Sequence, residues 1–251
     1  MKLTILGAGW LGFELARNLK NKYKIVVSSR DEEKLKIYED EGFSSYILNE
    51  QNFDYIEELL NTDFLFINFP PSKFENYLSF LEKIYSSKNI SNIKKIIFIS
   101  STSIYPNTNG IFTEISEINN PSSQIVFEAE NLIKERSDII FRVSGLVGDN
   151  RYFGKRSANK EVEFPLTPIN FVHREDVIRA TKFVLENNIS GIFNLCSNEH
   201  PTKKDIYSFN AKKYGFKMPI FNSNQTFLNR IIDSSKIEKL GFVYKYKSPY
   251  F

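Results

Sequence analysis

A glycine-rich stretch near the start of the chain, Gly7-Ala8-Gly9-Trp10-Leu11-Gly12, constrains the fold more than any other feature of the sequence. The apolar run 2–6 precedes it, a helical pattern over 13–19 follows it, and residues 24–29 have the composition of a second buried strand. The order strand, G-x-G-x-x-G, helix, strand is the context that the dinucleotide-binding fingerprint requires. The sequence therefore predicts a β-α-β unit that binds a dinucleotide.

Each glycine of this motif has a physical task in such a unit. Gly7 makes the tight turn out of the strand, Gly9 lets the pyrophosphate approach the backbone, and Gly12 lets the helix pack close to the strand. The N–H groups and the dipole at the helix N-terminus attract the phosphates. We expect the whole turn, with Trp10 and Leu11, to contact the cofactor.

The end of the second strand bears on which dinucleotide is bound. An NAD site usually has an acidic residue about 20 positions beyond the motif, bonded to the ribose 2′-hydroxyl. This chain has Ser28-Ser29-Arg30 instead, and an arginine there favours a 2′-phosphate through charge-assisted hydrogen bonds to which Ser29 adds. The sequence thus favours NADP. Two alternatives stay open: Arg30 pairs with Glu33, or Asp31 supports NAD.

Composition excludes several classes of protein. The chain has 251 residues, enough for one α/β domain, and a net charge of +3, which gives no nucleic-acid or membrane signal. Its single cysteine, Cys196, cannot form an internal disulfide, as is typical of a reducing compartment. No apolar run approaches the length of a membrane-spanning helix. Residues 1–11 are interpreted as the first strand and not as a signal peptide, because glycines interrupt the apolar stretch and no cleavage-site pattern follows. We expect a cytoplasmic protein.

The rest of the chain alternates strand and helix patterns. The predicted strands are 43–47, 64–68, 93–100, 139–143 and 191–195, and the predicted helices are 31–41 with Asp31 as its cap, 53–60, 74–85, 125–136, 174–187 and 203–214, capped by Thr202. Such alternation indicates βαβ units and a parallel sheet. We therefore predict an α/β fold with a Rossmann-type doubly wound parallel sheet. The chain is interpreted as one NAD(P)-binding domain, 1–251, with a cofactor-binding part at about 1–148 and a small substrate lobe drawn mainly from 149–251.

Two stretches of the second half carry basic side chains. Residues 149–168 are predicted to be irregular, and the cations there either hold an anionic substrate or belong to a solvated loop; they are Arg151, Lys155, Arg156 and Lys160. Residues 242–247 alternate aromatic residues with valine or lysine. This period of two predicts a half-buried strand, in preference to a surface for single-stranded nucleic acid.

Several motifs along nearly the whole chain resemble those of one family. Beside the glycine motif, these are Ile99-Ser100-Ser101-Thr102-Ser103-Ile104-Tyr105, Arg142-Val143-Ser144-Gly145-Leu146-Val147-Gly148, Asn170-Phe171-Val172-His173-Arg174-Glu175-Asp176 and Gly191-Ile192-Phe193-Asn194-Leu195. Together they resemble the extended short-chain dehydrogenases/reductases of the NAD-dependent epimerase/dehydratase type. The pairs Trp10-Leu11 and Pro70-Pro71 are most similar to the atypical branch of that family.

The resemblance implies a site above the carboxyl ends of the strands. Ser101 matches the family's serine that hydrogen-bonds the substrate hydroxyl or carbonyl. Phe69, Pro70 and Pro71 lie where the family contacts the cofactor after the fourth strand. Tyr105, four residues beyond Ser101, is a candidate proton donor or a residue of the pocket wall.

One departure from the family concerns proton transfer. The family uses a Tyr-x-x-x-Lys dyad, in which the lysine charge favours the phenolate of a tyrosine that otherwise has a pKa of about 10. Residues 106–133 contain neither tyrosine nor lysine. If Ala129-Glu130 matches the family's Ala-Glu, the dyad positions hold Ser122 and Val126. Ser101, Tyr105 or a bound water is then left to act as the acid.

The functional interpretation follows from these motifs. We expect an NAD(P)-dependent oxidoreductase or epimerase acting on a small carbonyl or nucleotide-sugar-like substrate, phosphorylated or nucleotide-linked. The alternative is a non-catalytic NADP-binding sensor or interaction protein. We expect no nucleic-acid or membrane partner, and a homodimer stays open. With only two histidines, a metal site at His173 and Asp176 is poorly supported. We expect Asp176 to serve the helix N-terminus with His173 packed beneath it, and Arg142 to bind substrate or to brace the core.

Overall fold

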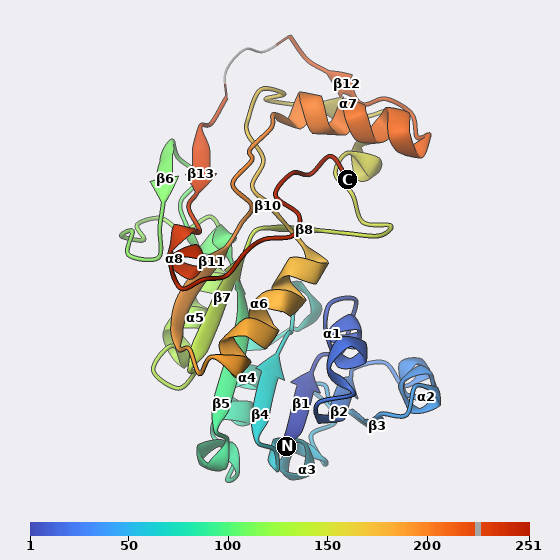
Figure 1. Ribbon diagram of the computed structural model, residues 1–251, viewed down its shortest axis with the longest axis vertical. Coiled ribbons are helices and arrows are strands. Elements are labelled where there is room, and N and C mark those ends of the chain that lie inside the picture. Colours follow the sequence, from blue (N-terminus) through green and yellow to red (C-terminus); the bar gives the residue numbers. More distant parts are fainter. Residues whose placement is uncertain (224–226) are drawn as a thin grey trace. The chain divides into compact units, whose positions relative to one another are not determined.

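The computed structural model describes residues 1–223 and 227–251 (Figure 1). A seven-stranded sheet has the order β11-β7-β5-β4-β1-β2-β3. Its strands are β1 (Lys2–Leu6), β2 (Lys24–Ser29), β3 (Ser44–Ile47), β4 (Phe64–Ile67), β5 (Lys95–Ser101), β7 (Ile139–Val143) and β11 (Gly191–Leu195). The pairs β1–β2, β2–β3, β1–β4 and β4–β5 are all parallel. The predicted α/β class and doubly wound parallel sheet are confirmed.

The chain forms two compact units that interleave along the sequence. The first consists of Met1–Ser100, Ser123–Phe141 and Asn188–Ile192, and the second of Ser101–Ser122, Arg142–Asn187 and Phe193–Phe251. The first unit holds helices α1 (Gly12–Leu19), α2 (Glu33–Asp40), α3 (Ile56–Leu60), α4 (Tyr77–Tyr85) and α5 (Gln124–Ile133). It also holds the short 3₁₀ helices η1 (Pro71–Lys73) and η2 (Ile90–Asn92).

The first unit packs helices on both faces of its strands. Leu6 of β1 belongs to a large apolar core that includes buried side chains of α3, α4 and α5. Ile5 points to the opposite face, since successive side chains of a strand alternate, and there it meets Gly12 of α1. Strand order reverses at β1, which lies between β4 and β2. At such a switch point open α/β sheets bind ligands beyond the carboxyl ends of the strands.

Within the described residues, the second unit holds three α-helices and three two-stranded parallel ribbons. The helices are α6 (Arg174–Glu186), α7 (Lys203–Tyr214) and α8 (Ser235–Lys239), with 3₁₀ helices η3 (Thr102–Ile104) and η4 (Lys155–Ser157). The ribbons pair β6 (Gly110–Phe112) with β13 (Arg230–Ile232), β8 (Gly145–Val147) with β10 (Phe171–His173), and β9 (Glu161–Val162) with β12 (Ile220–Phe221). Residues 149–168 are irregular apart from η4 and β9, as predicted.

The observed helix boundaries differ from the predicted ones where a side chain binds the backbone. The helix predicted from residue 74 begins at Tyr77, because Phe74 is extended; the carboxylate of Glu50 accepts the N–H groups of Glu75 and Asn76 at 3.1 and 2.7 Å. At α7 the prediction is confirmed: Thr202 and Asp205 form a reciprocal capping box.

The strand predicted over 242–247 is wrong, although its pattern of burial is right. Phe242 and Tyr244 are buried and Val243 and Lys245 are exposed, yet the segment joins no sheet. The carboxylate of Asp176 accepts the N–H groups of Lys245 and Tyr246 at 2.7 and 2.9 Å. These backbone donors are therefore used by a side chain instead of a neighbouring strand.

Asp176 and His173 exchange the roles that the sequence suggested. His173 is the N-cap of α6, and its Nδ1 accepts the N–H of Glu175 at 3.1 Å. The Asp176 side chain is fully buried and binds the C-terminal segment, as described above, rather than the N-terminus of its own helix. The His173 ring stacks on Tyr246 with centroids 3.6 Å apart. Burial lowers the pKa of His173.

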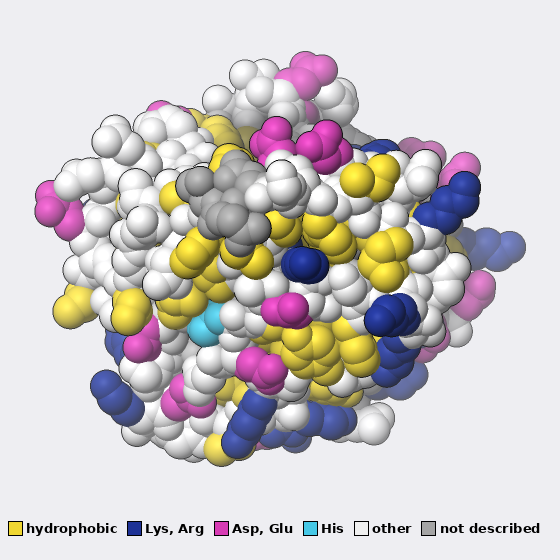
Figure 2. All heavy atoms as spheres, turned by 90° about the horizontal axis from the view of Figure 1, so that it is seen from above, with side chains coloured by type: hydrophobic (Ala, Val, Ile, Leu, Met, Phe, Trp, Pro, Cys, Tyr) yellow, Lys and Arg dark blue, Asp and Glu magenta, His cyan; other side chains and the backbone are white. Residues whose placement is uncertain are grey.

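Two surface properties bear on partners. None of the helices within residues 1–223 and 227–251 is both long and apolar enough to span a membrane. On the face shown in Figure 2, Lys and Arg side chains of the described residues are interspersed with Asp and Glu side chains.

Candidate functional site

The turn between β1 and α1 is fixed by hydrogen bonds from both neighbouring strands. Ser28 of β2 accepts the N–H of Gly7 through its Oγ at 3.1 Å and the N–H of Ala8 through its carbonyl oxygen at 2.8 Å. Asn68, just after β4, donates from Nδ2 to the carbonyl oxygen of Gly7 at 3.2 Å. The hydroxyl of Tyr38 on α2 donates to the carbonyl oxygen of Ala8. The turn is therefore held rigidly at the switch point of the sheet.

The three glycines of the turn differ in what surrounds them. Gly7 has a φ of +81°, and a Cβ there would lie 2.6 Å from the carbonyl oxygen of Asn68. At Gly12 a Cβ would lie 2.9 Å from the Ile5 side chain and 3.0 Å from the carbonyl oxygen of Gly7. Gly9 is exposed, and a Cβ there would meet no atom within 4 Å. Two glycines thus serve packing, and the third leaves the backbone open to solvent.

The N-terminus of α1 begins directly after this open position. Its N-cap is Leu11, which is buried and makes no side-chain capping hydrogen bond, while Trp10 is half-buried. A helix N-terminus without a side-chain cap retains its capacity to bind an anion. This geometry fits the pyrophosphate of a dinucleotide above Gly9.

Arg30 lies exposed at the end of β2, where the sequence analysis placed a cofactor contact. Its Nη1 donates to the carbonyl oxygen of Lys73 at 2.8 Å, and its guanidinium carbon lies 5.3 Å from the centroid of the Phe74 ring. The alternative in which Arg30 pairs with Glu33 is wrong, because among the described residues no carboxylate lies within salt-bridge distance of Arg30. Arg30 retains donors for an anion.

The residues on either side of Arg30 have local hydrogen bonds. Ser29 is 6% exposed, and its Oγ accepts the N–H of Asp31 at 3.0 Å. The carboxylate of Asp31 accepts the N–H of Glu33 at 3.1 Å and lies 3.8 Å from the ammonium of Lys34. One carboxylate oxygen of Asp31 therefore binds the backbone at the start of α2, and the other pairs with Lys34.

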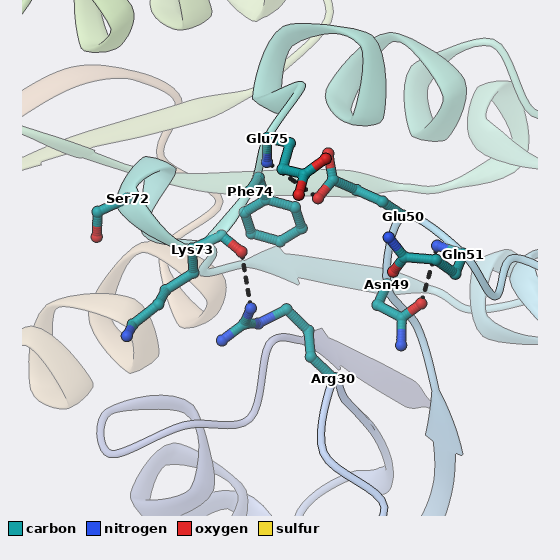
Figure 3. A pocket seen from close by; sticks show the side chains of 8 residues that line it. All are labelled: Arg30, Asn49, Glu50, Gln51, Ser72, Lys73, Phe74 and Glu75. Carbon is teal, nitrogen blue, oxygen red and sulfur yellow. Dashed lines mark hydrogen bonds between the residues drawn. The ribbon is translucent and has the colours of Figure 1, made fainter.

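A cavity of about 450 Å³ lies beside Arg30 (Figure 3). Its walls come from the segments that follow β2, β3 and β4, and they consist of Arg30, Asn49, Glu50, Gln51, Ser72, Lys73, Phe74 and Glu75. The volume is within the range of about 300–1,000 Å³ typical of small-molecule sites. The sequence motifs pointed to Arg30 but to none of the other seven residues. Their signal was positional, since they follow the carboxyl ends of β3 and β4.

The segment after β4 connects this cavity to the glycine turn. Phe69 is 4% exposed, and its ring packs edge-on against Phe74 and Phe80. A Cβ at Gly7 would lie 2.8 Å from this ring. Pro70 precedes η1, and Pro71 begins it. The role of these three residues in cofactor binding stays a prediction.

In the second unit, Ser101 and Tyr105 flank η3. The Oγ of Ser101 accepts hydrogen bonds from the N–H and the hydroxyl of Ser103 at 3.1 and 3.0 Å, and the residue is half-buried. Tyr105 is completely buried; its hydroxyl donates to Asn194 Oδ1 at 2.7 Å and accepts from Arg142 Nη1 at 2.8 Å. Burial raises the pKa of Tyr105, and the charge of Arg142 opposes that rise. Arg142 braces this buried network.

The positions that align with the missing dyad provide no equivalent chemistry. Ser122 donates its hydroxyl hydrogen to the carbonyl oxygen of Tyr105 at 2.8 Å. Val126 is a half-buried residue of α5. Within the described residues, no group of three or more His, Cys, Asp or Glu side chains is arranged to hold a metal ion.

Comparisons with known proteins agree with the sequence motifs. No family model matches the chain. Protein YeeZ of Escherichia coli K12 is 32% identical over an alignment of 266 residues, which covers 99% of this chain and 97% of YeeZ. This chain belongs to the family of YeeZ. The name YeeZ carries no activity, so the relationship identifies the family without assigning a reaction.

Solved structures identify the fold. A putative NAD-dependent epimerase/dehydratase from Methylobacillus flagellatus superposes with a TM-score of 0.80 at 19% identity, covering 98% of this chain and 94% of that one. UDP-glucuronic acid 4-epimerase from Bacillus cereus, in complex with NAD, gives a TM-score of 0.79 at 20% identity, covering 100% and 93%. The fold that the resemblance to extended short-chain dehydrogenases/reductases implies is thereby confirmed.

Proposed function

We propose that this relative of YeeZ is an NADP-preferring oxidoreductase or epimerase that acts on a small carbonyl or nucleotide-sugar-like substrate. The observation that carries the proposal is the open backbone at Gly9 beside the uncapped start of α1, together with the exposed guanidinium of Arg30. These features suit a pyrophosphate and a 2′-phosphate, respectively. A single buried thiol, Cys196, fits the expected cytoplasmic location.

NADP, rather than NAD, is the finer part of the proposal. The Bacillus cereus epimerase with the same fold is described in complex with NAD. In this chain the residue at the end of β2 is Arg30, and an arginine repays its desolvation beside a phosphate better than beside a neutral hydroxyl. Asp31 is less suited to a ribose hydroxyl because its carboxylate already contacts Glu33 and Lys34.

Bound NADP would supply hydride transfer, and the residues of the chain would bind, orient and shield the reactants. Ser101 is the stronger of the two predicted catalytic residues, because it is half-buried and its hydroxyl lies at a strand end. Tyr105 is fully buried with its hydroxyl bonded on two sides. We propose that Ser101 hydrogen-bonds the substrate oxygen, and that Tyr105 acts on the substrate only if this network opens.

Basic side chains of the second unit support an anionic substrate. Desolvation and the neighbouring charges of Arg156 and Arg174 lower the pKa of Arg151. Arg174 is already paired with Asp149, whereas a phosphate or diphosphate would relieve the repulsion between Arg151 and Arg156. We propose that this group, with Lys155 and Lys160, selects phosphorylated or nucleotide-linked substrates.

Calorimetric titration of the purified protein with NADPH and with NADH tests the cofactor proposal. We expect tighter binding of NADPH, and in Arg30→Ala a fall in NADPH affinity toward the NADH value. Arg17→Ala removes an exposed arginine of α1 that pairs with Glu41, and it serves as the control with unchanged preference. Absence of binding for both dinucleotides would refute the proposal.

A non-catalytic NADP-binding protein is the second candidate. The observation that favours it is the replacement of the dyad by Ser122 and Val126 together with the burial of the Tyr105 hydroxyl. A screen of NADP⁺ and NADPH against nucleotide sugars and small carbonyl compounds separates the two. Turnover that falls in Ser101→Ala supports the enzyme, whereas cofactor binding without turnover across the panel supports the sensor.

A further inference from the structure

Lys73 is fixed at the mouth of the cavity by its own backbone. It ends η1, where its N–H donates to the carbonyl oxygen of Pro70 at 3.1 Å. Its carbonyl oxygen accepts the Nη1 hydrogen of Arg30 at 2.8 Å. The main chain of Lys73 thus holds the guanidinium of Arg30, and both residues line the same cavity.

The side chains of Arg30 and Lys73 have no acidic partner in the part of the chain that the structure describes. Among the described residues, no carboxylate lies within salt-bridge distance of the Lys73 ammonium or of the Arg30 guanidinium. Figure 3 shows both groups on one side of the cavity, whereas the carboxylates of Glu50 and Glu75 lie on the other side of the Phe74 ring. Glu50 is occupied with the N–H groups of Glu75 and Asn76. The cavity therefore has a cationic end and an acidic end.

Two cations that line one cavity attract a ligand of high negative charge. A phosphate monoester carries a charge of about −1.5 to −2 at pH 7, more than one guanidinium neutralises. The guanidinium supplies a planar fork of donors, and the ammonium on its flexible stem supplies a point charge. A ribose 2′-phosphate matches this pair in charge and in the number of oxygen acceptors.

We propose that Lys73 is a cofactor-specificity residue, whose ammonium group binds the 2′-phosphate of NADP together with Arg30. This inference rests on the proposed NADP preference and adds a second residue to it. Lys73 lies 43 positions beyond Arg30 in the sequence. The two meet because β1 alone separates β2 from β4 in the sheet, and each residue follows the carboxyl end of one of these strands.

The decisive variant is Lys73→Ala, which removes the ammonium but keeps the carbonyl oxygen that holds Arg30. Lys73→Arg restores the charge. Lys88→Ala is the matched control, because Lys88 is an exposed lysine beyond the opposite end of α4. Dissociation constants for NADPH and NADH are measured by calorimetry for all three and for the unaltered protein, at low and high salt. Thermal unfolding of each variant checks that it is folded.

Lys73→Ala is expected to weaken NADPH binding by about tenfold or more, the effect of one charge-assisted hydrogen bond, and to leave NADH binding unchanged. Its NADPH affinity should also depend less on salt than that of the unaltered protein, because one charge contact is gone. Lys73→Arg should keep the preference for NADPH, and Lys88→Ala should match the unaltered protein in every measurement.

The outcomes separate this inference from the function on which it rests. If the unaltered protein binds NADPH and NADH equally, both the NADP preference and the role of Lys73 are overturned. If the preference exists and is lost in Arg30→Ala but retained in Lys73→Ala, the role of Lys73 alone is overturned. If both variants lose the preference while Lys88→Ala retains it, both proposals are supported.

Discussion

Two regions differ in how their polar groups are used: the proposed cofactor region of the first unit, and the loop of the second unit that carries Ser101 and Tyr105. Around the glycine turn, Gly9 is open and α1 has no side-chain cap, and no carboxylate of residues 1–223 and 227–251 pairs with Arg30 or Lys73. Around η3, by contrast, the Tyr105 hydroxyl is bonded on two sides and Ser101 is bonded by Ser103. The first region has polar groups with which to bind an anion, whereas the hydroxyl groups of the second region are hydrogen-bonded to other protein groups. The structure of the glycine-turn region therefore indicates ligand binding.

The largest expected effect is on stability, and it distinguishes Gly7 from Gly9 within the glycine turn. Gly7→Ala should destabilise the protein by about 2 to 4 kcal/mol, because it combines a strained positive φ with a contact of 2.6 Å to the Asn68 carbonyl oxygen. Gly9→Ala should change the free energy of unfolding by less than about 1 kcal/mol, because its Cβ would meet no atom within 4 Å. Chemical denaturation measures both.

Gly9→Ala should instead weaken dinucleotide binding, since its methyl group would occupy the space proposed for the pyrophosphate. Calorimetry with NADPH checks this on the same sample. A Gly9→Ala protein that is stable and binds as tightly as the unaltered chain would contradict the assignment of this backbone to the cofactor.

The second prediction examines the satisfied network of the other region. Tyr105→Phe should cost about 1 to 3 kcal/mol of stability, because it leaves the buried Asn194 and Arg142 without a hydroxyl partner. Ser101→Ala removes a half-exposed hydroxyl and should cost less than about 1 kcal/mol. Equal losses of stability in the two variants, measured by urea denaturation, would contradict the distinction between the buried Tyr105 hydroxyl and the half-exposed Ser101 hydroxyl.

Some of this architecture follows from the sequence, and some of it arises only on folding. The bounds of β7, β11 and α7 were predictable because short, mostly apolar runs and a Thr-x-x-Asp cap are local signals. Lys73 and Glu50 were not, because their partners are distant in sequence and meet only through the order of the strands. The strand predicted over 242–247 was wrong for the same reason. A period of two indicates which side chains are buried, but it does not indicate what the backbone binds. Here the N–H groups of Lys245 and Tyr246 donate to the carboxylate of Asp176.

The smallest predicted effect is a difference in acid sensitivity between the two units. The only histidines of the chain, His173 and His200, both lie in the second unit, and burial lowers the pKa of each. A histidine whose folded pKa lies below its unfolded value of about 6.5 favours folding fully above that pH, and this contribution is lost as the pH falls through the folded pKa. In addition, protonation of Nδ1 would break the cap that His173 gives to α6.

Hydrogen exchange at pH 7 and pH 5.5, corrected for intrinsic rates, measures this difference. Amides at the start of α6 should lose protection at the lower pH by an amount equivalent to about 1 kcal/mol or less, while those of β1 and β2 should keep theirs. The change at α6 should be smaller in His173→Asn, which offers a cap that does not titrate. Equal loss in both regions of the unaltered protein would mean that the histidines are not responsible.

The most direct test of the central claim is a crystal structure of the full chain grown with NADPH. The account predicts the pyrophosphate above Gly9 at the start of α1, and the 2′-phosphate within hydrogen-bonding distance of both the Arg30 guanidinium and the Lys73 ammonium. NADPH bound with its 2′-phosphate away from both cations, or with another group against Gly9, would contradict it.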